Sequence, residues 1–180
     1  MSTHRSHSLG PSNGTLTVKT GRTGAVAKVG HDLLLEVAAW RATLELAEDV
    51  SRCRLELSAD SSSLHVREGT GGMTELGEDD RVNIEQTIGD EVLHGSDIAF
   101  RSSGCSGDAE RLRFEGELTV AGATHPLSVD LRLDRSGRLH GSATVRQTDW
   151  GIKPYSTLFG ALKVADEVEV RFAGSLDQSR

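Results

Sequence analysis

Hydrophobic and polar residues alternate with a period of two along most of the chain. In the most regular run the apolar positions include Leu112, Phe114, Leu118 and Val120, and the positions between them are charged or polar. Strands of this kind have one dry face and one wet face. Segments with the same rhythm begin near Leu16, Ala27, Trp40, Cys53, Leu64, Ile98, Leu127, Leu139 and Val168. The pattern predicts an all-β protein.

The number of these strands restricts how the sheet can be arranged. About eight strands cannot bury their dry faces in a flat open sheet, so the sheet must close into a barrel or fold over as a sandwich. A closed barrel also removes exposed strand edges, which favours it. We expect an antiparallel β-barrel of about eight strands.

The alternation changes phase near Ala38 and Ala39. Odd-numbered positions are mostly apolar from Ala27 to Val37, whereas even-numbered positions are apolar from Trp40 onward. Because a shift by one residue moves the apolar set to the other face, the pattern predicts a bulge or a bend at this point.

One stretch follows a helical period instead of a strand period. Ile84, Ile88 and Val92 are spaced by four residues, and acidic residues occupy positions 78–80. Negative charge is favourable at a helix N-terminus because of the helix dipole. The pattern predicts one short helix over about 79–92 that lies against one end of the barrel.

The chain has the length of a single domain, at 180 residues and 19.3 kDa. Residues 1–12 are polar and lack a pattern, so we expect a mobile tail there and a single barrel domain over residues 13–177. In the tail no apolar stretch follows the charges, as it would in a secretory signal. Two cysteines, Cys53 and Cys105, are too few for a disulfide framework. These features favour a cytoplasmic protein.

The composition argues against several classes of partner. The formal net charge is −7 and aromatic residues make up 4% of the chain, which disfavours nucleic acid. An acidic surface is also unsuited to docking on an anionic membrane. No window approaches the roughly 20 apolar residues of a membrane-spanning helix, so stable membrane insertion is not expected.

Several strings of residues, taken in order, resemble segments of a known family. They are Val29–Leu33, Leu55–Leu64, Asp97–Ser103, Phe114–Leu127, Thr148–Ile152 and Ala165–Val170. Their order and spacing resemble those of the YceI-like family of lipid-binding barrels over about residues 15–176. The resemblance implies an extended, lipocalin-like barrel that holds a polyisoprenoid or isoprenoid-quinone chain in its lumen.

Candidate ligand-binding residues lie on the dry faces of the strands and in a ring-rich segment near the C-terminus. On the strands they are Leu33, Leu35, Trp40, Leu64, Phe100 and Phe114, and in the ring-rich segment they are Trp150, Tyr155, Phe159 and Leu162. Small residues at predicted inward positions leave volume for a ligand: Ala25, Ala27, Ala42, Cys53, Gly116, Ala143 and Gly174. Alternatively, larger side chains fill the lumen. The ring-rich segment forms the lip or floor of a hydrophobic pocket, or it plugs one end of the barrel.

His31 is the candidate that could contact the polar head of a ligand. It follows Gly30 on an apolar run, where its imidazole would hydrogen-bond a polar ligand head at the mouth. The alternative is a histidine whose polar atoms are satisfied by backbone carbonyls. We favour this alternative because buried polar groups usually find protein partners.

No pattern in the sequence points to catalysis. The histidines lack the local spacing of a preformed metal site, and the Gly-x-Ser-x-Gly elbow of a serine hydrolase is absent. We therefore expect no cofactor, no metal and no enzymatic activity.

The sequence favours a binding or carrier protein that sequesters a long-chain, isoprenoid-like amphiphilic lipid. One alternative is a packed barrel that serves as a stress-related or partner-binding scaffold. A second is a small metal-dependent or hydrolytic enzyme. The oligomeric state stays open, with a homodimer as one alternative.

Overall fold

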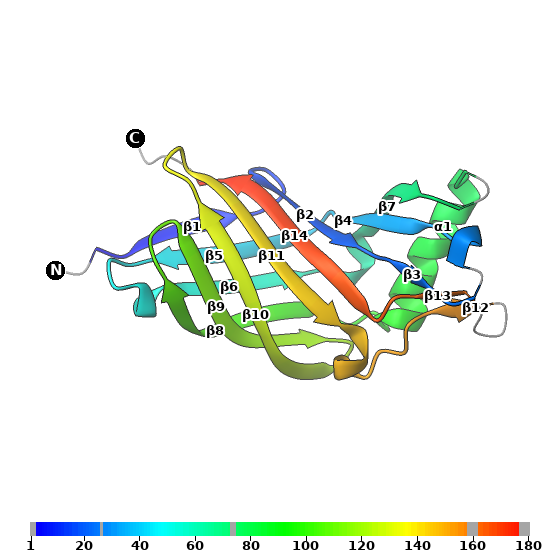
Figure 1. The fold of residues 1–180 in the computed structure, drawn as a ribbon. Helices are drawn as coiled ribbons and strands as arrows, with labels where there is room; N and C mark the ends of the chain where they lie inside the picture. Colours follow the sequence, from blue (N-terminus) through cyan, green and yellow to red (C-terminus); the bar gives the residue numbers. More distant parts are fainter. Residues whose placement is uncertain (1–2, 26, 73–74, 158–161, 177–180) are drawn as a thin grey trace.

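The computed structural model describes residues 3–25, 27–72, 75–157 and 162–176, most of which lie in β-strands (Figure 1). The strands are β1 (Arg5–Leu9), β2 (Gly14–Lys19), β3 (Arg22–Thr23), β4 (Asp32–Val37), β5 (Trp40–Leu46), β6 (Arg54–Ala59), β7 (Leu64–Thr70), β8 (Ile98–Gly107), β9 (Arg111–Val120), β10 (Ala123–Leu133), β11 (Arg138–Arg146), β12 (Ser156–Thr157), β13 (Leu162–Val164) and β14 (Glu167–Ser175). The helical segments are α1 (Glu78–Thr87), a π-helical turn (Ile88–Val92) and 3-10 turns at Ala27–Val29, Val50–Arg52, Ser61–Ser63 and Gln147–Trp150.

The long strands form a closed antiparallel ring. The chain passes from β4 into β5 and from β6 into β7 across short corners, so each of these pairs acts as one long bent strand. The described residues then give a ring of eight: β2, β4–β5, β6–β7, β8, β9, β10, β11 and β14, which pairs back with β2. The predicted lipocalin-like barrel is confirmed. A separate small sheet contains β12, β13 and β3.

The corner between β4 and β5 is the predicted bend near Ala38 and Ala39. The Ala38 N–H donates to the Ser63 carbonyl (2.9 Å), and the Ala39 N–H donates to the Ser63 hydroxyl oxygen (3.0 Å). The Asp60 N–H donates to the Ala39 carbonyl (3.0 Å). The Asp60 carboxylate in turn accepts the Ser62 N–H (2.9 Å) and shapes the second corner. The two bent strands therefore stay paired as they turn.

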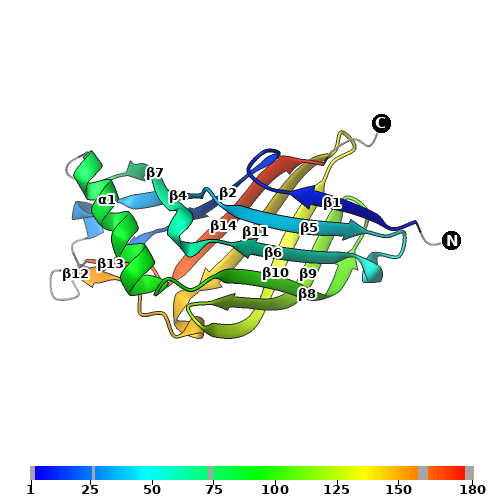
Figure 2. The ribbon, with the colours of Figure 1, turned by 180° about the vertical axis from the view of Figure 1, so that it is seen from behind.

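The predicted helix is confirmed as α1 and its π-helical extension. Figures 1 and 2 show α1 lying across one end of the barrel beside β7. The Gly77 N–H donates to the Asp80 carboxylate (3.0 Å) at the start of the helix. At its end the Leu93 N–H donates to the Ile88 carbonyl (2.9 Å), the longer spacing of a π turn. In the described part of the chain, no helix has the length and apolarity needed to cross a membrane.

The predicted alternation is most regular in β9. Every second residue from Leu112 to Val120 is buried, and the residues between them are exposed or half-buried. The hairpin between β10 and β11 turns at Gly137, whose φ of 87° is the positive value expected for a glycine at this tip. Strand β9 therefore keeps one face toward the interior along its whole length.

The strand predicted to begin at Ala27 begins instead at Asp32. Residues 27–29 form a 3-10 turn that is held by the Arg22 side chain. The Arg22 guanidinium donates to the carbonyls of Ala27 (3.0 Å) and Gly30 and to the Asp32 carboxylate (3.0 Å). Because these bonds occupy carbonyls that a sheet ladder would use, the apolar rhythm before Asp32 does not become a strand.

The mobile tail predicted over residues 1–12 is wrong for Arg5–Leu9, which form strand β1. This strand pairs with β5, with Leu9 opposite Ala42 and Arg5 opposite Leu46. Leu9 is only 5% exposed. Pairing of this kind depends on backbone hydrogen bonds, so a polar sequence conceals it. The domain boundary at residue 13 stays a prediction.

The close contact between β8 and β9 provides a test of the packing. At Gly116 a Cβ atom would lie 2.3 Å from the Arg101 carbonyl oxygen and 2.8 Å from the Phe100 ring. We expect Gly116→Ala to lower the free energy of unfolding in urea by about 1–3 kcal/mol. The control is Gly104→Ala, where a Cβ would have no atom within 4 Å. The control should change stability by less than about 1 kcal/mol, and equal losses in both variants would contradict this packing.

Candidate ligand-binding cavity

A cavity of about 440 Å³ lies inside the ring of strands. Each of the eight strands of the ring contributes residues to its wall, and α1 with the π turn contributes at one end. The lining is mostly Leu, Val, Ile, Ala, Phe and Trp, and none of the lining residues in the described part of the chain is charged. Its volume and apolar wall are within the range of small-molecule binding sites.

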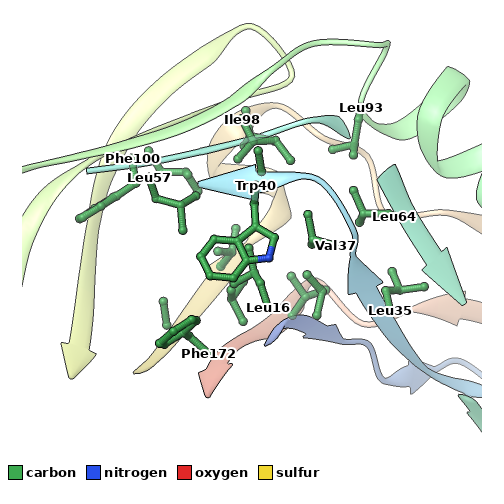
Figure 3. A pocket seen from close by; sticks show the side chains of 18 of the residues that line it. Leu16, Leu35, Val37, Trp40, Leu57, Leu64, Leu93, Ile98, Phe100 and Phe172 are labelled. Carbon is green, nitrogen blue, oxygen red and sulfur yellow. The ribbon is translucent and has the colours of Figure 1, made fainter. Parts of the chain in front are cut away.

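Two aromatic rings meet in the wall of this cavity. Trp40 on β5 and Phe172 on β14 form an edge-to-face pair, with ring centroids 5.4 Å apart and planes at 78° (Figure 3). Glycine makes room for the Phe172 ring: a Cβ at Gly14 would lie 2.5 Å from it, and one at Gly174 would lie 2.6 Å from it. The pair therefore links strands from two sides of the ring and presents aromatic surface to the lumen.

The helical segment covers the cavity with its apolar side. Ile84 of α1, Ile88 and Val92 of the π turn, and Leu93 just after it, all line the cavity. Leu93 and Leu64 of β7 lie at the same end of the cavity in Figure 3. The four-residue spacing of the isoleucines and Val92 is therefore explained by the lumen beneath the helix.

Polar contacts attach α1 to the edge of β7. The Glu85 carboxylate accepts the Val66 backbone N–H (2.8 Å), and its other oxygen lies 3.6 Å from His65 Nδ1. The Arg81 guanidinium donates to the carbonyls of Val66 and Arg67, both at 3.3 Å. The helix thus supplies β7 with the partners that a neighbouring strand would otherwise provide.

Polar lining residues gather at the end of the cavity near α1. They include Thr20 after β2, Asn83 and Thr87 of α1, and Tyr155 before β12. Tyr155 is 46% exposed, so this end of the cavity reaches solvent. Gln147 also lines the cavity, and its side-chain amide donates to a backbone carbonyl (3.0 Å). The cavity is therefore apolar in the barrel and more polar near the helix.

The structure brings together six of the residues that the sequence selected. Those lining the cavity are Leu33, Leu35, Trp40, Leu64, Phe100 and Tyr155. Phe159 lies outside the described residues, and so does the side chain of Leu162.

Three other selected residues do not line the cavity. Phe114 is fully buried, at 0% exposure, and packs in the core. The Trp150 indole N–H donates to the Leu118 carbonyl (2.8 Å), and its ring meets the His125 ring edge-on with centroids 5.8 Å apart. Trp150 thus packs as a buried anchor. His31 is half-buried outside the cavity wall.

Small residues leave space in the lumen, although not all of those expected to do so. Ala42 on β5 and Ala143 on β11 line the cavity. Cys53 is buried in the core away from the cavity, and Ala25 is exposed, so its predicted inward position is wrong.

The cavity also contains residues that the sequence reasoning did not select. Phe172, Leu127 and Val129 continue the strand alternation, whereas Ile84 and Ile88 follow the helical period. The signal for both patterns was present in the sequence. However, alternation does not tell which dry position meets open space and which is packed.

Perturbed carboxylates on the outside of the barrel have structural roles. The Ser136 hydroxyl donates to the Asp134 carboxylate (2.6 Å) and lowers the pKa of that carboxyl. The Ser62 hydroxyl lowers the pKa of Asp60 in the same way (2.7 Å). Both carboxylates shape exposed turns. Across the described residues, no group of three or more His, Cys, Asp or Glu side chains is placed to hold a metal ion.

An antiparallel barrel around an apolar cavity is the architecture of a lipocalin-like binding protein. The model of the YceI-like domain family matches residues 13–176. The chain therefore belongs to the YceI-like family, as its sequence motifs predicted. This family has a binding-protein fold rather than an enzyme fold, and it binds lipid-like ligands.

Solved structures show the same fold at low sequence identity. BcnA from Burkholderia cenocepacia is 13% identical, with a TM-score of 0.65 over 89% of this chain and 94% of its own. The YceI protein of Campylobacter jejuni is 11% identical, with a TM-score of 0.57 over 81% of this chain and 85% of its own. A mutant of that protein, crystallised with a monobromobimane guest, has a TM-score of 0.60 at 11% identity and the same coverage. A search of the curated proteins finds no match.

The attachment of α1 gives a testable expectation. Replacing Glu85 by alanine leaves the Val66 N–H without its acceptor. Because alanine is a good helix former, the substitution should leave α1 itself intact. A hydrogen bond to a charged group contributes about 1.5–3 kcal/mol, so the Val66 amide should exchange about tenfold faster or more by NMR. The control is Glu91→Ala, since Glu91 is exposed and makes no hydrogen bond to β7 among the described residues. Unchanged exchange in Glu85→Ala would contradict this attachment.

Proposed function

We propose that this protein binds and carries a long-chain, isoprenoid-like lipid whose tail occupies the lumen. The observation that supports this proposal most directly is the uncharged, apolar cavity inside the ring. A tail that enters such a cavity leaves water. Burial contributes roughly 0.8 kcal/mol for each CH₂ group, so a long tail gains enough to offset the cost of association.

The distribution of polar residues supports one orientation for the lipid. The tail extends into the barrel past Trp40 and Phe172, where the wall is apolar. The head lies near Asn83, Thr87 and Tyr155, whose side chains offer neutral hydrogen-bonding groups at the solvent end. A polyisoprenoid or an isoprenoid quinone has this combination of a long branched tail and a compact polar end.

The two alternative functions have less support. A scaffold without a ligand needs no internal space, whereas this barrel holds about 440 Å³ behind its wall. An enzyme needs a reactive constellation, and the polar groups that line the cavity are hydroxyls and amides of Thr, Ser, Asn, Gln and Tyr.

Native mass spectrometry of protein purified from its host should show a retained lipid. Lipid-free protein from fresh host cells would favour the scaffold.

Filling the lumen should block lipid binding. Ala143 lines the cavity, so Ala143→Phe places a ring where the tail would lie. We expect the Kd for geranylgeraniol to rise at least about tenfold, a loss of about 1.4 kcal/mol, measured by the change in tryptophan fluorescence, since Trp40 lies in the cavity wall. The matched control is Thr144→Phe, on the exposed face of the same strand. Equal affinity of both variants and the wild type would contradict binding in the lumen.

The uncharged lining predicts a preference for a neutral head group. An ionised carboxylate that is partly withdrawn from water without a cationic partner is costly. At pH 8 we expect geranylgeraniol to bind about tenfold or more tightly than palmitate in the same fluorescence titration. Tighter binding of palmitate would mean that a basic residue outside the cavity wall selects the ligand.

Three further expectations from the sequence stay predictions. They are the cytoplasmic location, a stress-related role and a homodimer. Cell fractionation tests the first, a comparison of growth with and without the gene under stress tests the second, and light scattering of the purified chain tests the third.

A further inference from the structure

The two cysteines of the chain are neighbours in space although they are far apart in sequence. Cys53 follows the 3-10 turn between β5 and β6, and Cys105 lies near the end of β8. Both belong to the end of the barrel remote from α1, where the β5–β6 connection and the β8–β9 hairpin meet (Figure 1). Neither thiol is bonded in a disulfide, and neither residue lines the cavity.

The strand register places the two cysteines opposite one another on neighbouring strands. Strands β6 and β8 pair antiparallel, with Glu56 opposite Arg101, and the next N–H, of Leu55, donates to the Ser102 hydroxyl oxygen (2.9 Å). The pairing of β8 with β9 then skips one residue of β8 just after Ser102. With one extra residue in β8, continuing the register places Cys105 opposite Cys53. The side-chain spacing on such neighbouring strands is within disulfide range.

Both side chains point to the inside of the barrel. Cys105 is the register partner of Phe114, and paired residues on antiparallel strands project to the same face. Phe114 is fully buried, so Cys105 faces inward as well. Cys53 is 2% exposed, and its sulfur accepts the Ala47 N–H (3.4 Å). The two thiols thus share one inner face.

The electrostatics of Cys105 are consistent with this proximity. Burial and the adjacent Cys53 thiol raise the pKa of the Cys105 thiol to about 11. A raised pKa leaves little thiolate at neutral pH, so the pair stays reduced for long periods when oxidants are dilute.

We propose that Cys53 and Cys105 are a disulfide-forming pair that links β6 to β8 under oxidising conditions. The link closes a long loop of chain, which includes the bent strand β6–β7 and α1, and neither cysteine belongs to the cavity wall. It acts as a redox-dependent crosslink at the end of the barrel opposite the helix. This proposal does not rest on lipid binding.

Oxidised glutathione is a sufficient oxidant for this reaction. The thiolate of the more exposed Cys105 attacks one sulfur of glutathione disulfide, which forms a mixed disulfide and releases one glutathione thiolate. The Cys53 thiolate then attacks the Cys105 sulfur, the Cys53–Cys105 bond forms, and the second glutathione leaves. The protein loses two protons and two electrons, and glutathione disulfide becomes two glutathione thiols.

Intact-mass spectrometry of the folded, reduced full chain with oxidised glutathione tests the proposal. The expected product is a monomer lighter by two hydrogen atoms, with its disulfide peptide joining Cys53 and Cys105. Because thiolate increases about tenfold for each pH unit below the pKa, the rate should rise about a hundredfold from pH 7 to pH 9. A stable glutathione adduct, a disulfide-linked dimer, or no reaction at pH 9 would overturn the proposal.

Matched variants separate a specific pair from general thiol reactivity. Cys53→Ser should stop at the mixed disulfide of glutathione with Cys105, because the second thiol is missing. Oxidation should raise the Tm of the wild type by about 5–10 °C, because the crosslink restricts the unfolded chain. The Tm of Cys53→Ser should not rise on oxidation. A rise of equal size in both proteins would contradict a link between these two residues.

Discussion

The rest of the structure depends on the closure of the sheet through two bent strands. Each strand of the ring is hydrogen-bonded on both sides only because β4–β5 and β6–β7 turn the same corner together. The corner is held by bonds among Ala38, Ala39, Asp60 and Ser63. Without this joint turn, β4 and β5 would extend in one direction, and the apolar faces of the sheet would meet water instead of one another.

Closure makes an interior, and the side chains decide how much of it is filled. A ring of about eight strands is just wide enough to be packed solid or to hold one small ligand. Here Phe172 lies close over Gly14 and Gly174, and alanines at positions 42 and 143 add little bulk. The same apolar faces therefore serve as a folding core and as a binding surface. The residues that leave space give up some packing stability for that purpose.

The sequence allowed the architecture to be predicted because the long strands keep one face inward. The polar strand Arg5–Leu9 was missed because its pairing depends on backbone groups, which the side-chain pattern does not report. The site was only partly predictable. Phe100 and Phe114 have the same chemistry and both face inward, yet Phe100 lines the cavity and Phe114 lies in the packed region beside Cys105. Depth along the barrel separates them, and alternation contains no information on depth.

The contacts between α1 and β7 have a consequence for the lifetime of the molecule in a crowded solution. On one side β7 is paired with β4, and on the other its Val66 amide and carbonyl bind Glu85 and Arg81. An unpaired strand edge is a template for a strand of another molecule. Because the side chains of α1 occupy the backbone groups through which another strand would add, the helix protects this edge from self-association in a crowded solution.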